Sequence, residues 1–128
     1  EPVAADQHGY LNLIHVFDAV QVILAAEACE TLSPLLLVSD GQPVLRSAYF
    51  QEMARLLQAP DPLFSPADPQ SPGAQRANSD KRISNQRLLA ELNISFRYPS
   101  FREGLAVLLG SPIDADPENF SDGRTTAT

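Results

Sequence analysis

The chain has 128 residues, a formal net charge of −7 and a sequence pI near 4.6. This length suits one small domain with a single core, and the acidity argues against a nucleic-acid or anionic-membrane partner, because phosphates would repel such a surface. The single cysteine, Cys29, cannot form an internal disulfide, which is typical of a cytoplasmic protein, and no apolar run approaches the ~20 residues of a membrane span.

The first predicted elements are a β-prone run over residues 10–16 and a helix over residues 18–30. Asp18 followed by Gln21 has the pattern of a capping box, in which each side chain satisfies a free backbone amide of the other. The helix therefore is predicted to begin at Asp18. Apolar residues at helical spacing predict its buried stripe, which comprises Phe17, Val20, Ile23 and Leu24.

The next predicted element is a strand over residues 35–38, Leu-Leu-Leu-Val, which shows no polar alternation. Such a run is typical of a strand that helices cover on both faces. Asp40-Gly41 then predicts a turn. Strand, helix and strand in this order form a β-α-β unit, so we expect a right-handed crossover in a parallel sheet that extends beyond these residues.

A second helix is predicted over residues 46–58, where Phe50, Met53 and Leu57 share one face and Pro60 prevents continuation. Residues 59–77 are rich in proline, aspartate and serine, which predicts a long extended surface loop.

A third helix is predicted from Ser84 to Asn93, because asparagine tolerates the left-handed conformation at which helices end. A fourth runs from Ser100, capped with Glu103, to Gly110. Residues 111–128 contain few apolar side chains and are expected to be a poorly ordered tail.

Two stretches of this pattern resemble a known family. They are Ile14-His15-Val16-Phe17-Asp18-Ala19, and the pair Lys81-Arg82-Ile83-Ser84-Asn85 with Tyr98-Pro99-Ser100-Phe101-Arg102-Glu103-Gly104-Leu105. In order and spacing they resemble the end of extended short-chain dehydrogenase/reductase (SDR) proteins of the NAD-dependent epimerase/dehydratase family, which includes a nucleoside-diphosphate-sugar epimerase branch.

The resemblance implies an α/β fold that is the C-terminal fragment of a Rossmann-type extended SDR, with about four helices and two or three short strands. It implies a lead-in over residues 1–9, a substrate-side region over 10–110 and the tail over 111–128. The expected partners are a nucleotide sugar or related small molecule and an N-terminal Rossmann portion, with NAD or NADP bound by the intact parent.

This chain alone is expected to be catalytically inactive and to hold no cofactor. It contains no Gly-x-Gly-x-x-Gly turn to cradle a dinucleotide, and its only lysine, Lys81, does not follow a tyrosine at the four-residue spacing that the family's proton exchange requires. The alternative is a non-catalytic module of SDR descent that binds a small ligand or another protein. In either case the sheet would be incomplete and would leave unpaired strand backbone groups and apolar helix faces exposed. We therefore expect the chain to self-associate.

The candidate substrate-binding residues are Asn12, Arg76, Lys81 and Arg82. The three cations belong to the densest basic group in an acidic chain, and such groups recognise phosphate, although a solvated surface is the simpler interpretation. Asn12 suits a substrate hydroxyl or a neighbouring backbone group. His15 is interpreted as a packed histidine, since no cluster at ligand spacing predicts a metal site.

Overall fold

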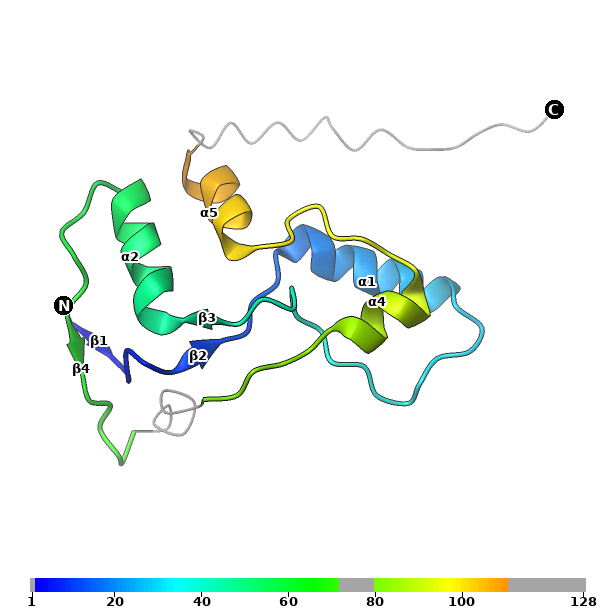
Figure 1. Ribbon diagram of the computed structural model, residues 1–128, viewed down its shortest axis with the longest axis horizontal. Coiled ribbons are helices and arrows are strands. Elements are labelled where there is room, and N and C mark those ends of the chain that lie inside the picture. Colours follow the sequence, from blue (N-terminus) through cyan, green and yellow to red (C-terminus); the bar gives the residue numbers. More distant parts are fainter. Residues whose placement is uncertain (1, 72–79, 111–128) are drawn as a thin grey trace.

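The computed structural model describes residues 2–71 and 80–110, which form an α/β fold (Figure 1). Four helices and four two-residue strands lie in this part of the chain. In chain order they are β1 (Val3–Ala4), β2 (Tyr10–Leu11), α1 (Val16–Ala28), β3 (Val44–Leu45), α2 (Arg46–Leu56), β4 (Phe64–Ser65), α4 (Gln86–Leu92) and α5 (Phe101–Gly110).

The strands make two separate two-stranded sheets. β1 pairs with β4 in parallel, with Val3 opposite Phe64, and β2 pairs with β3 antiparallel, with Tyr10 opposite Leu45. Residues 3–4 of the expected lead-in are therefore part of the folded region. The proline-rich stretch is likewise not wholly irregular, because β4 lies within it.

The helices contact one another in two pairs, α1 with α4 and α2 with α5, toward different ends of an elongated molecule (Figure 1). The buried core lies between α1 and α4, where Val22, Leu88 and Leu92 contact one another. Leu88 is 1% exposed and Leu92 is 9% exposed, so the third predicted helix packs its leucines into this core.

The predicted start of α1 at Asp18 is wrong. The helix begins at Val16, and the His15 side chain is the cap, accepting a hydrogen bond from the Phe17 backbone N–H. Asp18 is fully buried, and its carboxylate accepts hydrogen bonds from Arg97 and Tyr98. Asp18 therefore does not cap its own helix and instead binds backbone groups about 80 residues away in the sequence.

The predicted buried stripe of α1 is also wrong. Phe17, Val20, Ile23 and Leu24 are 39%, 44%, 65% and 54% exposed, and the buried residues of the helix are Asp18 and Val22. The helix contacts α4 through its other face, so the apolar side that helical periodicity identified is largely exposed, apart from Phe17, whose ring contacts Tyr98.

The predicted strand over residues 35–38 does not form, and the β-α-β unit is therefore absent from the described part of the chain. Leu35, Leu37 and Val38 are 71%, 52% and 44% exposed. A strand requires a neighbour for its backbone groups, and none of the described segments pairs with this run.

Other local predictions are confirmed. Helix α2 covers Arg46–Leu56, close to the predicted range, and Asn93 ends α4 in the left-handed conformation at φ 49°. Ser100 precedes α5, and its backbone N–H donates to Glu103 Oε2 at 2.8 Å. Gly41 takes φ 77° in the predicted turn.

Some predictions fall outside the described residues, namely the tail over 111–128 and residues 72–77 of the proline-rich loop. Within the described ranges, no helix has both the length and the apolar character needed to cross a membrane.

Candidate functional site

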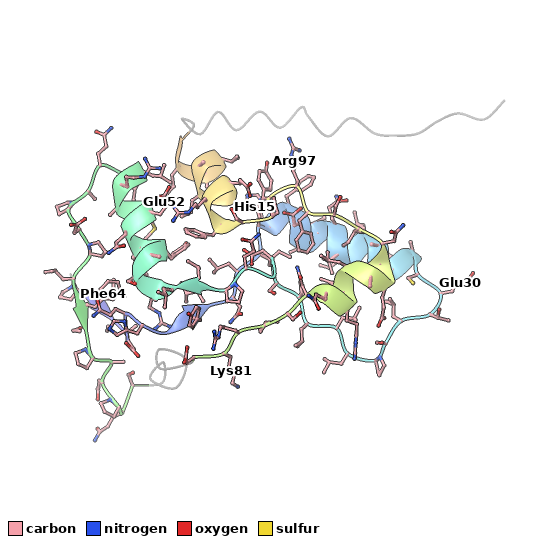
Figure 2. All side chains as sticks on the ribbon, in the orientation of Figure 1. His15, Glu30, Glu52, Phe64, Lys81 and Arg97 are labelled. Carbon is pink, nitrogen blue, oxygen red and sulfur yellow. The ribbon has the colours of Figure 1, made fainter. Side chains whose placement is uncertain are left out.

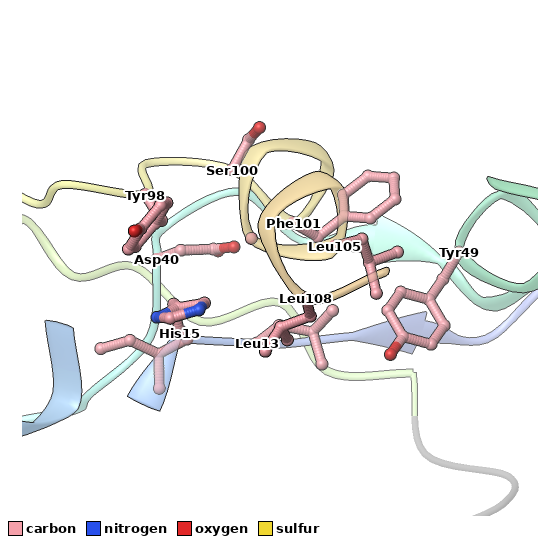
Figure 3. A pocket seen from close by; sticks show the side chains of 11 residues that line it. Leu13, His15, Asp40, Tyr49, Tyr98, Ser100, Phe101, Leu105 and Leu108 are labelled. Carbon is pink, nitrogen blue, oxygen red and sulfur yellow. The ribbon is translucent and has the colours of Figure 1, made fainter. Parts of the chain in front are cut away.

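A cavity of about 110 Å³ lies where the end of β2, the turn at Asp40 and the start of α5 come together (Figure 3). His15, Asp40, Tyr98 and Ser100 lie at one end, and apolar side chains together with Tyr49, which carries a hydroxyl, line the other end. Four parts of the chain therefore build this one site, because Tyr49 of α2 also lines it.

His15 is held by its role as the cap of α1. Its Nδ1 accepts a hydrogen bond from the Phe17 backbone N–H at 3.1 Å, so the proton of the neutral ring lies on Nε2. Nε2 is buried and has no hydrogen-bond partner among the described residues. The ring therefore carries an unpaired donor that neighbouring atoms cover.

Tyr98 covers His15 on one side. The two ring centroids are 4.1 Å apart with an interplanar angle of 40°, and Phe17 meets Tyr98 edge to face at 6.1 Å. The Asp18 carboxylate accepts from the backbone N–H groups of Arg97 at 2.8 Å and Tyr98 at 2.9 Å. Asp18 thus fixes the segment that places Tyr98 in the cavity wall.

Asp40 is 7% exposed and follows Ser39 in a tight turn. Its Oδ1 accepts from the Gln42 backbone N–H at 2.8 Å, and its own backbone N–H donates to the Leu13 carbonyl. Burial raises the pKa of Asp40 above its ordinary value, although the hydrogen bond from Gln42 acts in the opposite direction. The carboxylate is thus a buried acceptor within the cavity lining.

Gly104 allows α5 to approach His15 closely. A Cβ at this position would lie 3.1 Å from His15 Cδ2, tighter than most contacts of that kind. The apolar end is lined by Leu13, Tyr49, Phe101, Leu105 and Leu108 (Figure 3). None of the lining residues is a lysine or arginine, so the cavity wall has no positive side chain for a phosphate.

Asn12, a predicted substrate-binding residue, is occupied by backbone contacts. Its amide nitrogen donates to the Lys81 carbonyl at 2.7 Å, and its Oδ1 accepts from the Ile83 N–H at 2.7 Å. Asn12 therefore ties the segment before α4 to the end of β2. Of the two roles predicted for Asn12, the structure therefore shows the bonding to neighbouring backbone groups. These bonds also place Asn12 next to Lys81.

The basic residues lie on another surface. Lys81 and Arg82 are exposed, and the Arg82 guanidinium sits 4.9 Å from the centroid of the Tyr10 ring. Lys81 points outward, away from His15 (Figure 2). Arg76 lies outside the described residues. The structure thus places Lys81 and Arg82 near Tyr10 and Asn12, whereas neither lines the cavity.

Sequence reasoning did not identify His15, Asp40 and Tyr98 as one site. A weak signal was present, because a glycine inside the predicted fourth helix indicates a close approach by another group. No group of three or more histidine, cysteine, aspartate or glutamate side chains within residues 2–71 and 80–110 is arranged to hold a metal ion.

Comparison with known proteins finds one informative similarity. No protein-family model and no curated protein matches this sequence. A solved structure described as a functionally unknown conserved protein from Silicibacter pomeroyi DSS is 30% identical, with a TM-score of 0.71. The match covers 84% of this chain and 39% of that chain. This chain therefore spans well under half the length of that larger protein.

Proposed function

We propose that this chain is the substrate-side region of an NAD(P)-dependent epimerase/dehydratase-like protein of the extended SDR type, and that it does not catalyse turnover alone. One observation carries the proposal. The two sequence stretches that resemble this family, around His15-Val16-x-Asp18 and Tyr98-Pro99-Ser100, contact each other and line the same cavity.

The uncovered apolar surfaces support the same proposal. The exposed side of α1 and the unpaired run over residues 35–38 are what an α/β protein shows where part of its sheet is missing. In the proposed parent, an N-terminal Rossmann portion packs against these surfaces. The similarity to part of a larger chain from Silicibacter pomeroyi agrees with this arrangement.

The residues of this chain do not fit a dinucleotide. A pyrophosphate site requires free backbone amides at a glycine-rich turn that opens a helix. At the start of α1 the Phe17 amide is already bound by His15, and α2 follows β3 directly, without a glycine-rich turn. Cofactor binding and proton exchange with the substrate therefore belong to the proposed N-terminal portion.

The proposed role of this chain is to hold the substrate. Lys81 and Arg82 form an exposed basic surface beside Asn12, suited to the diphosphate of a nucleotide sugar. The chain as a whole is acidic and repels anions. Lys81 and Arg82 place two positive charges side by side, so an anionic ligand would be attracted to this surface.

Calorimetric titration with uridine and deoxythymidine diphosphate sugars tests this role. We expect binding that weakens about tenfold in a Lys81→Ala, Arg82→Ala double variant, because two charged contacts are lost. The matched control is Arg55→Gln, which removes an exposed arginine on α2, away from Lys81 and Arg82. This variant should bind the nucleotide sugars as tightly as the original chain. The absence of binding at millimolar ligand, or unchanged binding in the double variant, would reject the proposed substrate.

A second candidate is a non-catalytic small-ligand module of the same descent. The cavity supports it, because its lining is mostly apolar with a few polar groups, as is typical of small-ligand sites. Assaying the longer protein for NAD(P)-dependent conversion of sugar nucleotides distinguishes the two candidates. Turnover supports the enzyme, whereas ligand binding without turnover supports the module.

A further inference from the structure

The side chain of Asn12 holds both peptide groups that flank Arg82. Its Nδ2 donates to the Lys81 carbonyl at 2.7 Å, and its Oδ1 accepts from the Ile83 backbone N–H at 2.7 Å. One side-chain amide thus makes the pair of hydrogen bonds that a neighbouring strand would make at this residue. The backbone of Arg82 is therefore fixed, although the residue itself is exposed.

The ring of Tyr10 supports the other end of Arg82. The guanidinium carbon lies 4.9 Å from the ring centroid, within the range of a cation–π interaction. Tyr10 is itself fixed in β2, where it pairs with Leu45 of β3. Asn12 follows Tyr10 by two positions, the spacing of residues that share one side of an extended chain. This part of the chain therefore holds Arg82 at its backbone and at its guanidinium.

The segment that follows Arg82 is anchored as well. Asn85 is 7% exposed, and its Nδ2 donates to the Ser39 carbonyl at 2.9 Å. Lys81 and Arg82 thus belong to a segment with anchoring hydrogen bonds on both sides of the arginine. A ligand that binds to such a segment loses less conformational entropy than one that must order a mobile loop.

The guanidinium of Arg82 has donors to offer an anion. Neither Lys81 nor Arg82 forms an ion pair within residues 2–71 and 80–110, and Asp80, the acidic neighbour in the sequence, is exposed. A cation–π contact leaves the N–H groups of a guanidinium available to oxygen atoms. Arginine presents these groups as a planar fork that matches two oxygens of one phosphate, which the ammonium of lysine cannot do.

We propose that Arg82 is a pre-organised diphosphate-binding arginine and that Asn12 and Tyr10 are the positioning residues that hold it. Arg82 donates to two oxygens of one phosphate, and Lys81 adds a positive charge beside it. Asn12 then acts through Arg82 and does not contact a substrate hydroxyl. The inference rests on the substrate-holding role proposed above, and it identifies the residues that make the basic surface selective for phosphate.

Nitrogen relaxation of the arginine Nε–H groups tests the positioning without a ligand. We expect Arg82 to be more ordered than Arg87, an exposed arginine of α4 to which the described residues supply no aromatic ring. Asn12→Ala and Tyr10→Leu should each make the Arg82 group as mobile as that of Arg87. Tyr10→Phe keeps the ring and should keep the order. Gln21→Ala, which removes an exposed amide side chain of α1, is the control for Asn12→Ala.

Calorimetric titration with inorganic pyrophosphate at low ionic strength measures the consequence for binding. We expect a Kd in the millimolar range for the original chain. Asn12→Ala should weaken binding about fivefold because Arg82 is no longer held. Arg82→Lys should also weaken it about fivefold, because the charge remains but the fork is lost. Arg55→Lys makes the same exchange on α2 and should leave the affinity unchanged.

Four outcomes would overturn the inference. They are an Arg82 Nε–H as mobile as that of Arg87, unchanged affinity in Asn12→Ala, unchanged affinity in Arg82→Lys, and no binding of pyrophosphate at millimolar concentration. Failure of the proposed function is a separate result, in which pyrophosphate binds through Arg82 as described whereas the nucleotide sugars do not bind. Nucleotide-sugar binding that Asn12→Ala leaves intact would reject the positioning role alone.

Discussion

The carboxylate of Asp18, buried in the first turn of α1, accepts a hydrogen bond from the backbone N–H of Tyr98 at 2.9 Å. Because the Tyr98 ring lies against His15, this bond connects the start of α1 to the wall of the cavity. The same carboxylate holds the neighbouring Arg97 amide, so a single side chain fixes the whole segment before α5.

Asp18→Ala should destabilise the fold by about 2–4 kcal/mol, because two amides of a partly buried segment lose their acceptor. Urea denaturation followed by circular dichroism measures this change. Asp61→Ala removes an exposed aspartate and should change stability by less than about 0.5 kcal/mol. Equal effects of the two substitutions would show that the bonds to Arg97 and Tyr98 contribute little.

Gly41→Ala should destabilise the chain by on the order of 2–4 kcal/mol. The residue has φ 77°, and an added Cβ would clash with the side-chain amide of Asn85. Adding Asn85→Ala should recover part of this loss, so that the double variant is more stable than the sum of the single changes predicts. Gly110→Ala is the control, since nothing lies within 4 Å of its added Cβ.

Leu88→Ala should cost about 2–5 kcal/mol, because Leu88 is 1% exposed at the centre of the α1–α4 core. Leu35→Ala makes the same chemical change at a residue that is 71% exposed, and its effect should be within about 0.5 kcal/mol of zero. Thermal unfolding of both variants checks the expectation. A large effect at Leu35 would mean that the run over residues 35–38 is buried in solution.

Stability should fall in acid partly through Glu91. The Ser33 hydroxyl and backbone N–H donate to this carboxylate at 2.5 and 2.9 Å, which lowers the pKa of Glu91 below its ordinary value of 4.5. A lowered pKa stabilises the fold above pH 4.5, and the contribution disappears as the pH falls through the folded-state pKa.

Denaturant titrations of Ser33→Ala between pH 7 and pH 3 test this contribution. The stability difference from the original chain should be largest at neutral pH and should shrink in acid. Ser95→Ala, at an exposed serine, should show no such dependence. A difference that stays constant over this range would exclude the Glu91 contact as its source.

The chain should self-associate through the uncovered side of α1. Ile23→Glu should shift sedimentation velocity profiles toward monomer, because it places a charge on a residue that is 65% exposed within this apolar surface. Gln21→Glu adds the same charge at a polar exposed position of the helix and should leave association unchanged. A monomeric original chain at high concentration would contradict the expectation.

Local signals in the sequence predicted local structure well. The left-handed stop at Asn93, the turn at Gly41 and the extent of α2 all follow from the conformational preferences of a few adjacent residues. These preferences depend on residues only a few positions apart in the sequence, so they do not depend on how the rest of the protein packs.

Predictions that depended on burial failed for a different reason. The apolar stripe of α1 and the run over residues 35–38 were predicted to be buried, yet the stripe and three of the four residues of the run are exposed, and only Leu36 packs against the core. Periodicity identifies which side chains gain from leaving water, but it does not supply the surface that covers them. Asp18 was misassigned because its true partners, Arg97 and Tyr98, are adjacent only after folding.

The cavity could be predicted only in part. His15 lay within a recognisable motif, but its free donor follows from a side-chain hydrogen bond to Phe17 that no spacing rule specifies. The basic residues Lys81 and Arg82 were found because their charge stands out in an acidic chain. Sequence thus indicated the charged surface and missed the polar end of the cavity.

Gly104 limits how this fold can be engineered. Replacing a glycine inside a helix by alanine usually raises stability by about 1 kcal/mol, and consensus or propensity-guided redesign would select that change. Here the added methyl would press against the imidazole of His15, which caps one helix and walls the cavity from the other side. Rigidifying α5 would therefore tend to loosen α1, so thermostabilised versions of this chain should retain the glycine.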